Sequence, residues 1–151
     1  ARWCGDATRF NPAIAGLNLV ASCYVFDSSG VIFSAISTTT EIVNTFKLYA
    51  PLVGETLEPL RATILHTEEL PAVFDFARQL ATMGSPAVSV VIHGDEVDHI
   101  LASGPRVTYV LGHEQNAFTA LVSARDSYNL TDGSVDYIDL RFDGKVYLKK
   151  K

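Results

Sequence analysis

Two segments with helical periodicity interrupt a chain of short strand-like runs, and this alternation restricts the possible folds more than any other feature. The first helical segment begins at Thr67, has acidic residues in its opening turn and ends before Gly84. The second extends from about Glu114 to about Tyr128. In both segments the apolar residues fall on one stripe, which is typical of helices that pack one face against a core.

The strand-like runs are rich in β-branched and aromatic residues and are separated by turn residues. They are residues 23–26, 31–33, 46–49, 87–93, 97–102, 107–111, 135–142 and 145–149. The last two runs flank Asp143-Gly144, which is typical of a two-residue hairpin turn. The order hairpin, strand, helix, three strands, helix, hairpin predicts an α+β fold, with a mostly antiparallel, twisted sheet that carries two main helices on one face.

Composition excludes several classes of protein. The chain has 151 residues, of which 48% are hydrophobic and 19% charged, so we expect one folded domain and not a disordered segment. A formal net charge of −5 argues against a nucleic-acid-binding protein, since the only basic run is 149–151. No apolar stretch reaches the roughly 18 residues that a membrane span needs.

The histidines do not form a recognisable metal or catalytic motif. They are His66, His93, His99 and His113, and none of them makes a paired motif of the kind that binds zinc on one helix. No nucleophile motif and no phosphate-binding glycine loop is present, so neither a metal nor another cofactor is expected. Residues 95–99 are rich in possible ligands, and two interpretations remain open. They form a solvated turn, or His93, Asp95 and His99 line a pocket of a small-molecule-binding or hydrolytic domain.

The two cysteines also allow two interpretations. Cys4 and Cys23 each lie beside an aromatic residue, as residues on neighbouring strands would. They are buried reduced thiols, which are common in protein cores, or they form a disulfide, which requires an oxidising compartment. Their spacing does not fit a redox or zinc CxxC motif.

The C-terminal hairpin has an alternating pattern. Ile138, Leu140 and Phe142 would share one face of the strand, and Tyr137, Asp139 and Arg141 the other. A final strand is expected at a sheet edge, where charged residues either prevent unwanted pairing or accompany a partner strand.

Three segments carry a resemblance to a known family. Residues 23–33 read CYVFDSSGVIF, residues 49–54 read YAPLVG and residues 137–142 read YIDLRF. In the same order they resemble the Y-x-x-D-x-x-G-x-x-F hairpin, the L-P-x-x-x-G loop and the Y-V-D-L-R-Y strand of the FtsQ/DivIB family of bacterial cell-division proteins. The second match departs from the family pattern in two ways. Ala50 precedes the proline, and one residue fewer separates Pro51 from Gly54.

The resemblance implies a non-enzymatic scaffold of the divisome, anchored in the inner membrane by an upstream helix, with this domain on the periplasmic side. Residues 1–22 would be the junction with an upstream POTRA domain, and residues 23–151 the β-domain. A location outside the cytoplasm favours the disulfide between Cys4 and Cys23.

The resemblance also implies partners, namely FtsB/DivIC-like and FtsL-like division proteins bound by β-augmentation at the last strands. The residues that match the family's partner-binding strand, together with those that follow it, are Tyr137, Leu140, Arg141, Phe142, Gly144, Lys145 and Tyr147.

Overall fold

The computed structural model describes residues 2–10, 23–35, 46–54, 59–142 and 144–151. Within them the strands are β1 (Arg2–Trp3), β2 (Tyr24–Phe26), β3 (Ile32–Ala35), β4 (Lys47–Tyr49), β5 (Ala87–His93), β6 (Glu96–Leu101), β7 (Arg106–Val110), β8 (Val135–Asp139) and β9 (Tyr147–Lys150). The helices are α1 (Leu70–Thr82) and α2 (Glu114–Ser123), with short 3-10 helices η1 (Ala7–Arg9), η3 (Thr67–Glu69) and η4 (Arg125–Ser127). The domain boundary expected at residue 22 lies outside the described residues.

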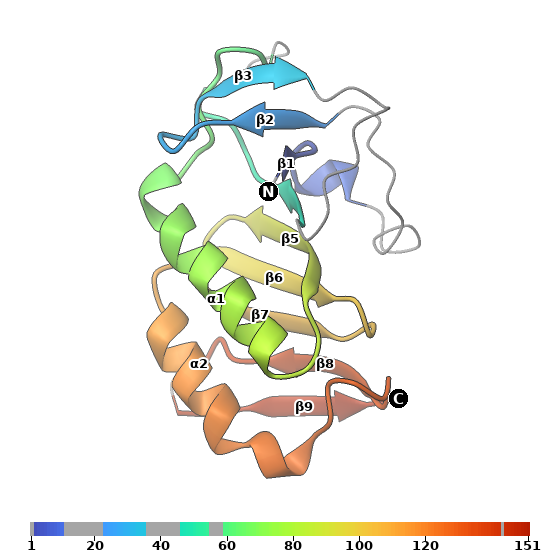
Figure 1. Cartoon of the computed structure of the whole chain (residues 1–151). Helices are drawn as coiled ribbons and strands as arrows, with labels where there is room; N and C mark the ends of the chain where they lie inside the picture. The colour runs from blue at the N-terminus through green and yellow to red at the C-terminus, as the bar shows by residue number, and fades with distance from the viewer. Residues whose placement is uncertain (1, 11–22, 36–45, 55–58, 143) are drawn as a thin grey trace.

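All these strands belong to one nine-stranded sheet in the order β3-β2-β1-β4-β5-β6-β7-β8-β9 (Figure 1). The expectation of a mostly antiparallel sheet with two main helices is wrong. The sheet is mixed, because β1–β4, β4–β5 and β7–β8 pair in parallel. The helices are also unequal, since α1 has 13 residues whereas α2 has 10 and ends at Ser123, well before the predicted Tyr128.

Two of the three parallel pairs, β4–β5 and β7–β8, have a simple cause, which is that a helix connects the two neighbouring strands. The chain passes from β4 through α1 to β5, and from β7 through α2 to β8. A crossover of this length returns the chain to the same end of the sheet, so the second strand runs parallel to the first.

Both helices lie on the same side of the sheet, with α1 crossing β5 to β7 and α2 next to it (Figure 1). The antiparallel pairs β5–β6 and β6–β7 make β5 and β7 run in the same direction, so both crossovers advance along the sheet in the same sense. Crossovers of the usual right hand then place both helices on one face.

The main core fills the space between this face and the helices. It includes Val73, Phe76 and Leu80 of α1, Ala117 and Leu121 of α2, and Val90, Ile92, Val97, Val107, Tyr109 and Ile138 of the strands. The alternation along β6 shows the two faces directly, because Val97, His99 and Leu101 are buried whereas Glu96 and Asp98 are only partly buried. β6 therefore directs Glu96 and Asp98 away from the helices, while His99 lies on the helix face.

A disulfide joins Cys4 and Cys23, as predicted. The two cysteines flank the antiparallel pair Trp3–Tyr24 that connects β1 to β2. Together with Tyr49 and Val91 they form a second, smaller apolar cluster.

Candidate functional site

The C-terminal half of the sheet carries two features of functional interest, a polar cavity on the face opposite the helices and the exposed edge at β9. The cavity has a volume of about 290 Å³. It is lined by His93, Glu96, Asp98, Arg106, Thr108, Tyr137, Asp139 and Arg141. The pairing of β6, β7 and β8 brings these residues together, since Asp98 lies opposite Thr108, and Thr108 opposite Asp139.

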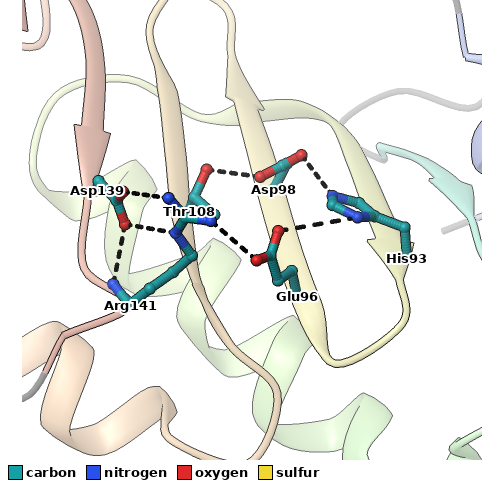
Figure 2. A network of polar contacts seen from close by, with 6 residues as sticks. All are labelled: His93, Glu96, Asp98, Thr108, Asp139 and Arg141. Atoms are coloured by element: carbon teal, nitrogen blue, oxygen red, sulfur yellow. Dashed lines mark hydrogen bonds and ion pairs between the residues drawn. The ribbon is translucent and has the colours of Figure 1, made fainter.

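A network of hydrogen bonds and ion pairs connects the charged groups of the cavity (Figure 2). Asp98 accepts a hydrogen bond from the Thr108 hydroxyl at 2.5 Å, and its other oxygen lies 3.0 Å from Nε2 of His93. Arg141 donates to both oxygens of Asp139, at 2.9 and 2.7 Å, and to Glu96 Oε1 at 2.9 Å. Each carboxylate of the cavity therefore has a partner within the site.

The electrostatics of the cavity are dominated by Arg141. Hydrogen bonds from Arg141 hold the pKa of Asp139 below its usual value, and the nearby charge of Arg106 acts in the same direction. In turn, hydrogen bonds to Asp139 and Glu96 raise the pKa of Arg141. Arg106 lies over the ring of Tyr137, with its guanidinium carbon 5.6 Å from the ring centre. The paired charges stabilise one another and fix the start of the segment that leads to β9.

The structure does not bring His93, Asp95 and His99 together. His93 lies in the polar cavity, and Asp95 is exposed in the turn that follows β5. His99 points to the opposite face, where it is fully buried and hydrogen bonded to the Tyr109 hydroxyl at 3.0 Å. Burial lowers the pKa of His99 to about 3, so its imidazole is neutral. Among the described residues no group of three or more His, Cys, Asp or Glu side chains is placed to hold a metal ion.

The predicted partner-binding residues lie between the cavity and the sheet edge. Tyr137 and Arg141 line the cavity, and Leu140 is buried in the core. Phe142 and Tyr147 are 50% and 48% exposed, and their rings meet edge to face with centroids 5.4 Å apart. The two remaining residues, Gly144 and Lys145, are exposed in the connection between β8 and β9.

The prediction of a two-residue turn at Asp143-Gly144 is wrong. The connection between the two strands is longer, because β8 ends at Asp139 and β9 begins at Tyr147. Asp139 ends the strand by accepting a hydrogen bond from the backbone N–H of Arg141 at 3.0 Å. The backbone of Leu140 still donates to Thr108 of β7 at 2.8 Å, while pairing with β9 has stopped. Asp143 itself lies outside the described residues.

β9 is the last strand of the sheet and pairs with β8 alone in the part of the chain that the structure describes. Its side chains are largely exposed, and only Leu148 is partly buried. The Phe142–Tyr147 pair lies at the beginning of this strand. The edge therefore combines a strand that has a neighbour on one side with an exposed aromatic surface.

The sequence patterns did not predict that five residues belong to one site, namely Glu96, Asp98, Arg106, Thr108 and Asp139. The alternation along each strand predicts that these residues lie on the polar face. Only the register between strands brings them together.

Comparison with models of known protein families and with curated proteins finds no match to the chain. Among the described residues no helix is both long enough and apolar enough to cross a bilayer.

Proposed function

We propose that this chain is a non-enzymatic scaffold domain of the bacterial divisome that binds FtsB/DivIC-like and FtsL-like proteins through its C-terminal edge. Two observations support the proposal. The sequence resembles the FtsQ/DivIB family in three segments that follow the family's order. Among the described residues, the last strand of the sheet pairs on one side only.

The observation that carries the proposal is the edge strand β9 with the Phe142–Tyr147 pair at its beginning. Main-chain hydrogen bonds to an added strand provide affinity in β-augmentation, and side-chain contacts provide specificity. Aromatic side chains are frequent anchors of protein interfaces because they bury a large apolar area. Here two of them are exposed beside the strand that would receive the partner.

The proposal includes a location. The domain would lie on the periplasmic side of the inner membrane, with the full protein anchored by an upstream helix. The Cys4–Cys23 disulfide supports this location, because disulfides persist in oxidising compartments. A hydrolytic or small-molecule-binding function is not proposed, since His93 and His99 lie on opposite faces of the sheet and Asp95 lies in a turn.

Replacement of the aromatic anchors tests the proposal. We expect Phe142→Lys and Tyr147→Lys each to weaken binding of the extracytoplasmic region of the FtsB/DivIC-like protein from the same genome by about thirtyfold, or about 2 kcal/mol. Isothermal titration calorimetry measures the affinity, and a thermal melt checks the fold. Because both side chains are about half exposed, the variants should stay folded.

Phe33→Lys is the matched control, because Phe33 is an aromatic residue with 61% exposure on β3, at the opposite edge of the sheet. This variant should bind like the unmodified protein. If the two variants at the C-terminal edge also bind like the unmodified protein, then this edge is not the partner site.

A further inference from the structure

The C-terminal edge has a charge that contrasts with the rest of the molecule. Residues 144–151 contain four lysines and no acidic residue, although the whole chain has a formal net charge of −5. Lys149 and Lys150 lie in β9 and are exposed. Lys149 lies 3.8 Å from Asp136 of β8, but both side chains are largely exposed and such pairs are weak. Hydrogen bonds with Ser134 lower the pKa of Asp132, and the charge of Lys150 acts in the same direction.

The lysines occupy one end of the strand and the apolar residues the other. Tyr147 pairs with Asp139 on the polar face, and Leu148 pairs with Ile138 on the helix face. Lys149 and Lys150 then follow, one on each face, opposite Tyr137 and Val135. The first half of β9 is therefore apolar on both faces, and the second half is cationic on both faces.

An added strand would place its side chains directly beside those of β9. Directly opposite residues in a sheet have Cβ atoms about 4.5–5.5 Å apart, so unlike charges attract and like charges repel. A second copy of this chain would bring two lysines of β9 from each copy, four in all, to one short edge. The lysines thus oppose self-pairing, which is a common protection of edge strands, while they attract an acidic strand.

From these observations we infer that β9 selects a partner strand of two halves, with apolar residues beside Tyr147 and Leu148 and acidic residues beside Lys149 and Lys150. The inference rests on the proposed function and specifies the chemistry of its partner. The apolar half would also contact Phe142, whose ring meets that of Tyr147. The order of the two halves along the partner decides whether it adds in the parallel or the antiparallel direction.

Charge reversal on both sides of the interface tests the inference. The probes are the extracytoplasmic region of the FtsB/DivIC-like protein from the same genome and two variants of it. In these variants the acidic residues of the bound segment are changed to Gln or to Lys. We expect the Gln variant to bind about tenfold more weakly, and this difference to shrink in about 0.5 M salt, where exposed charges are screened.

The complementary change is Lys149→Glu together with Lys150→Glu in this chain. This double variant should lose affinity for the unmodified partner and regain it for the Lys variant of the partner. Lys149→Gln with Lys150→Gln should bind the unmodified partner with an affinity between that of the unmodified chain and that of the double Glu variant. Arg78→Glu with Arg125→Glu is the matched control, because both arginines are exposed outside the edge, on α1 and η4, and the change in net charge is the same.

The outcomes separate this inference from the proposed function. If the partner protects the amides of β9 from hydrogen exchange but all charge variants bind equally well, the proposed function stands and the inference about charge is wrong. A bound segment without acidic residues would also overturn it. If the partner does not protect β9 at all, the proposed function itself fails.

Discussion

His99 is a fully buried residue whose ionisation makes the stability of the fold depend on pH below neutrality. Its ring packs against Phe76 and Tyr109, and its Nδ1 has no hydrogen-bond partner among the described residues. A charged imidazole would lose its hydration there without gaining a compensating carboxylate. The folded domain therefore keeps His99 neutral down to a pH of about 3, whereas an unfolded chain protonates it near its ordinary pKa of 6.5.

The sign of the pH dependence follows from this difference. Below pH 6.5 the unfolded chain takes up a proton that the folded domain does not, so the contribution of His99 lowers the free energy of unfolding as the pH falls towards 3. Between pH 6.5 and about 4.5 the loss should be about 2–3 kcal/mol, and above pH 6.5 it should vanish.

Urea unfolding of the wild type and of His99→Gln at several pH values measures this effect. Glutamine stays neutral and can hydrogen bond to the Tyr109 hydroxyl, so the variant should show a flatter pH dependence. The prediction fails if the difference in free energy of unfolding between the two proteins is the same at pH 7 and at about pH 4.5.

The disulfide acts at the scale of elements, because it joins the residue that follows β1 to the residue that precedes β2. β1 has only two residues, yet it connects β2 to β4. The bond joins cysteines 19 positions apart in the sequence. In the chain-entropy model, a loop of that length lowers the entropy of the unfolded chain and so stabilises the fold by about 3 kcal/mol.

We therefore expect Cys4→Ser with Cys23→Ser to lower the free energy of unfolding by about 3 kcal/mol. Chemical denaturation of the oxidised protein and of the double variant measures the loss in free energy of unfolding. The control is the unmodified protein with its disulfide reduced, which should be as stable as the variant. Equal stabilities of the oxidised protein and the variant would show that the bond does not hold β1 in place.

Most element positions could be predicted from the sequence, because they depend on local features. The run 87–93 is β5 as predicted, and Pro71 lies in the first turn of α1. Strand direction was not predicted correctly, since it depends on which strands become neighbours after each helix. The predicted turn at Asp143-Gly144 also failed, because the hydrogen bonds between Asp139 and Arg141 end β8 earlier.

The polar cavity could not be predicted from the sequence, because it depends on how the strands pair in the folded sheet. Its members come from β5, β6, β7, β8 and the segment after β8. Residues as far apart as Glu96 and Arg141 meet only after the crossover through α2 and the pairings β6–β7 and β7–β8 are complete. Strand periodicity predicts the face on which each residue lies, but not its neighbour on the next strand. The predicted C-terminal edge agrees with the sheet order, in which β9 is the last strand among the described residues.

At the scale of the whole molecule, the two edges of the sheet differ in the way that the proposed function requires. The helices cover one face, and within the described residues the two edge strands at which a strand could be added are β3 and β9. β3 carries the exposed Phe33 but is bonded at its beginning, where Ile32 donates to Ala62 and accepts from Arg61, at 2.9 and 2.7 Å. β9 has the aromatic pair and the lysines.

Hydrogen–deuterium exchange, measured residue by residue with and without the FtsB/DivIC-like extracytoplasmic region, tests the central claim most directly. A strand added at the C-terminal edge must bond to the outward backbone groups of β9, so those amides of Tyr147–Lys150 that point away from β8 should exchange more slowly in the complex. The amides of Ile32–Ala35 at the other edge should be unchanged and serve as the internal reference. Protection confined to Ile32–Ala35 or to the helices, with Tyr147–Lys150 exchanging as in the free protein, would contradict the claim.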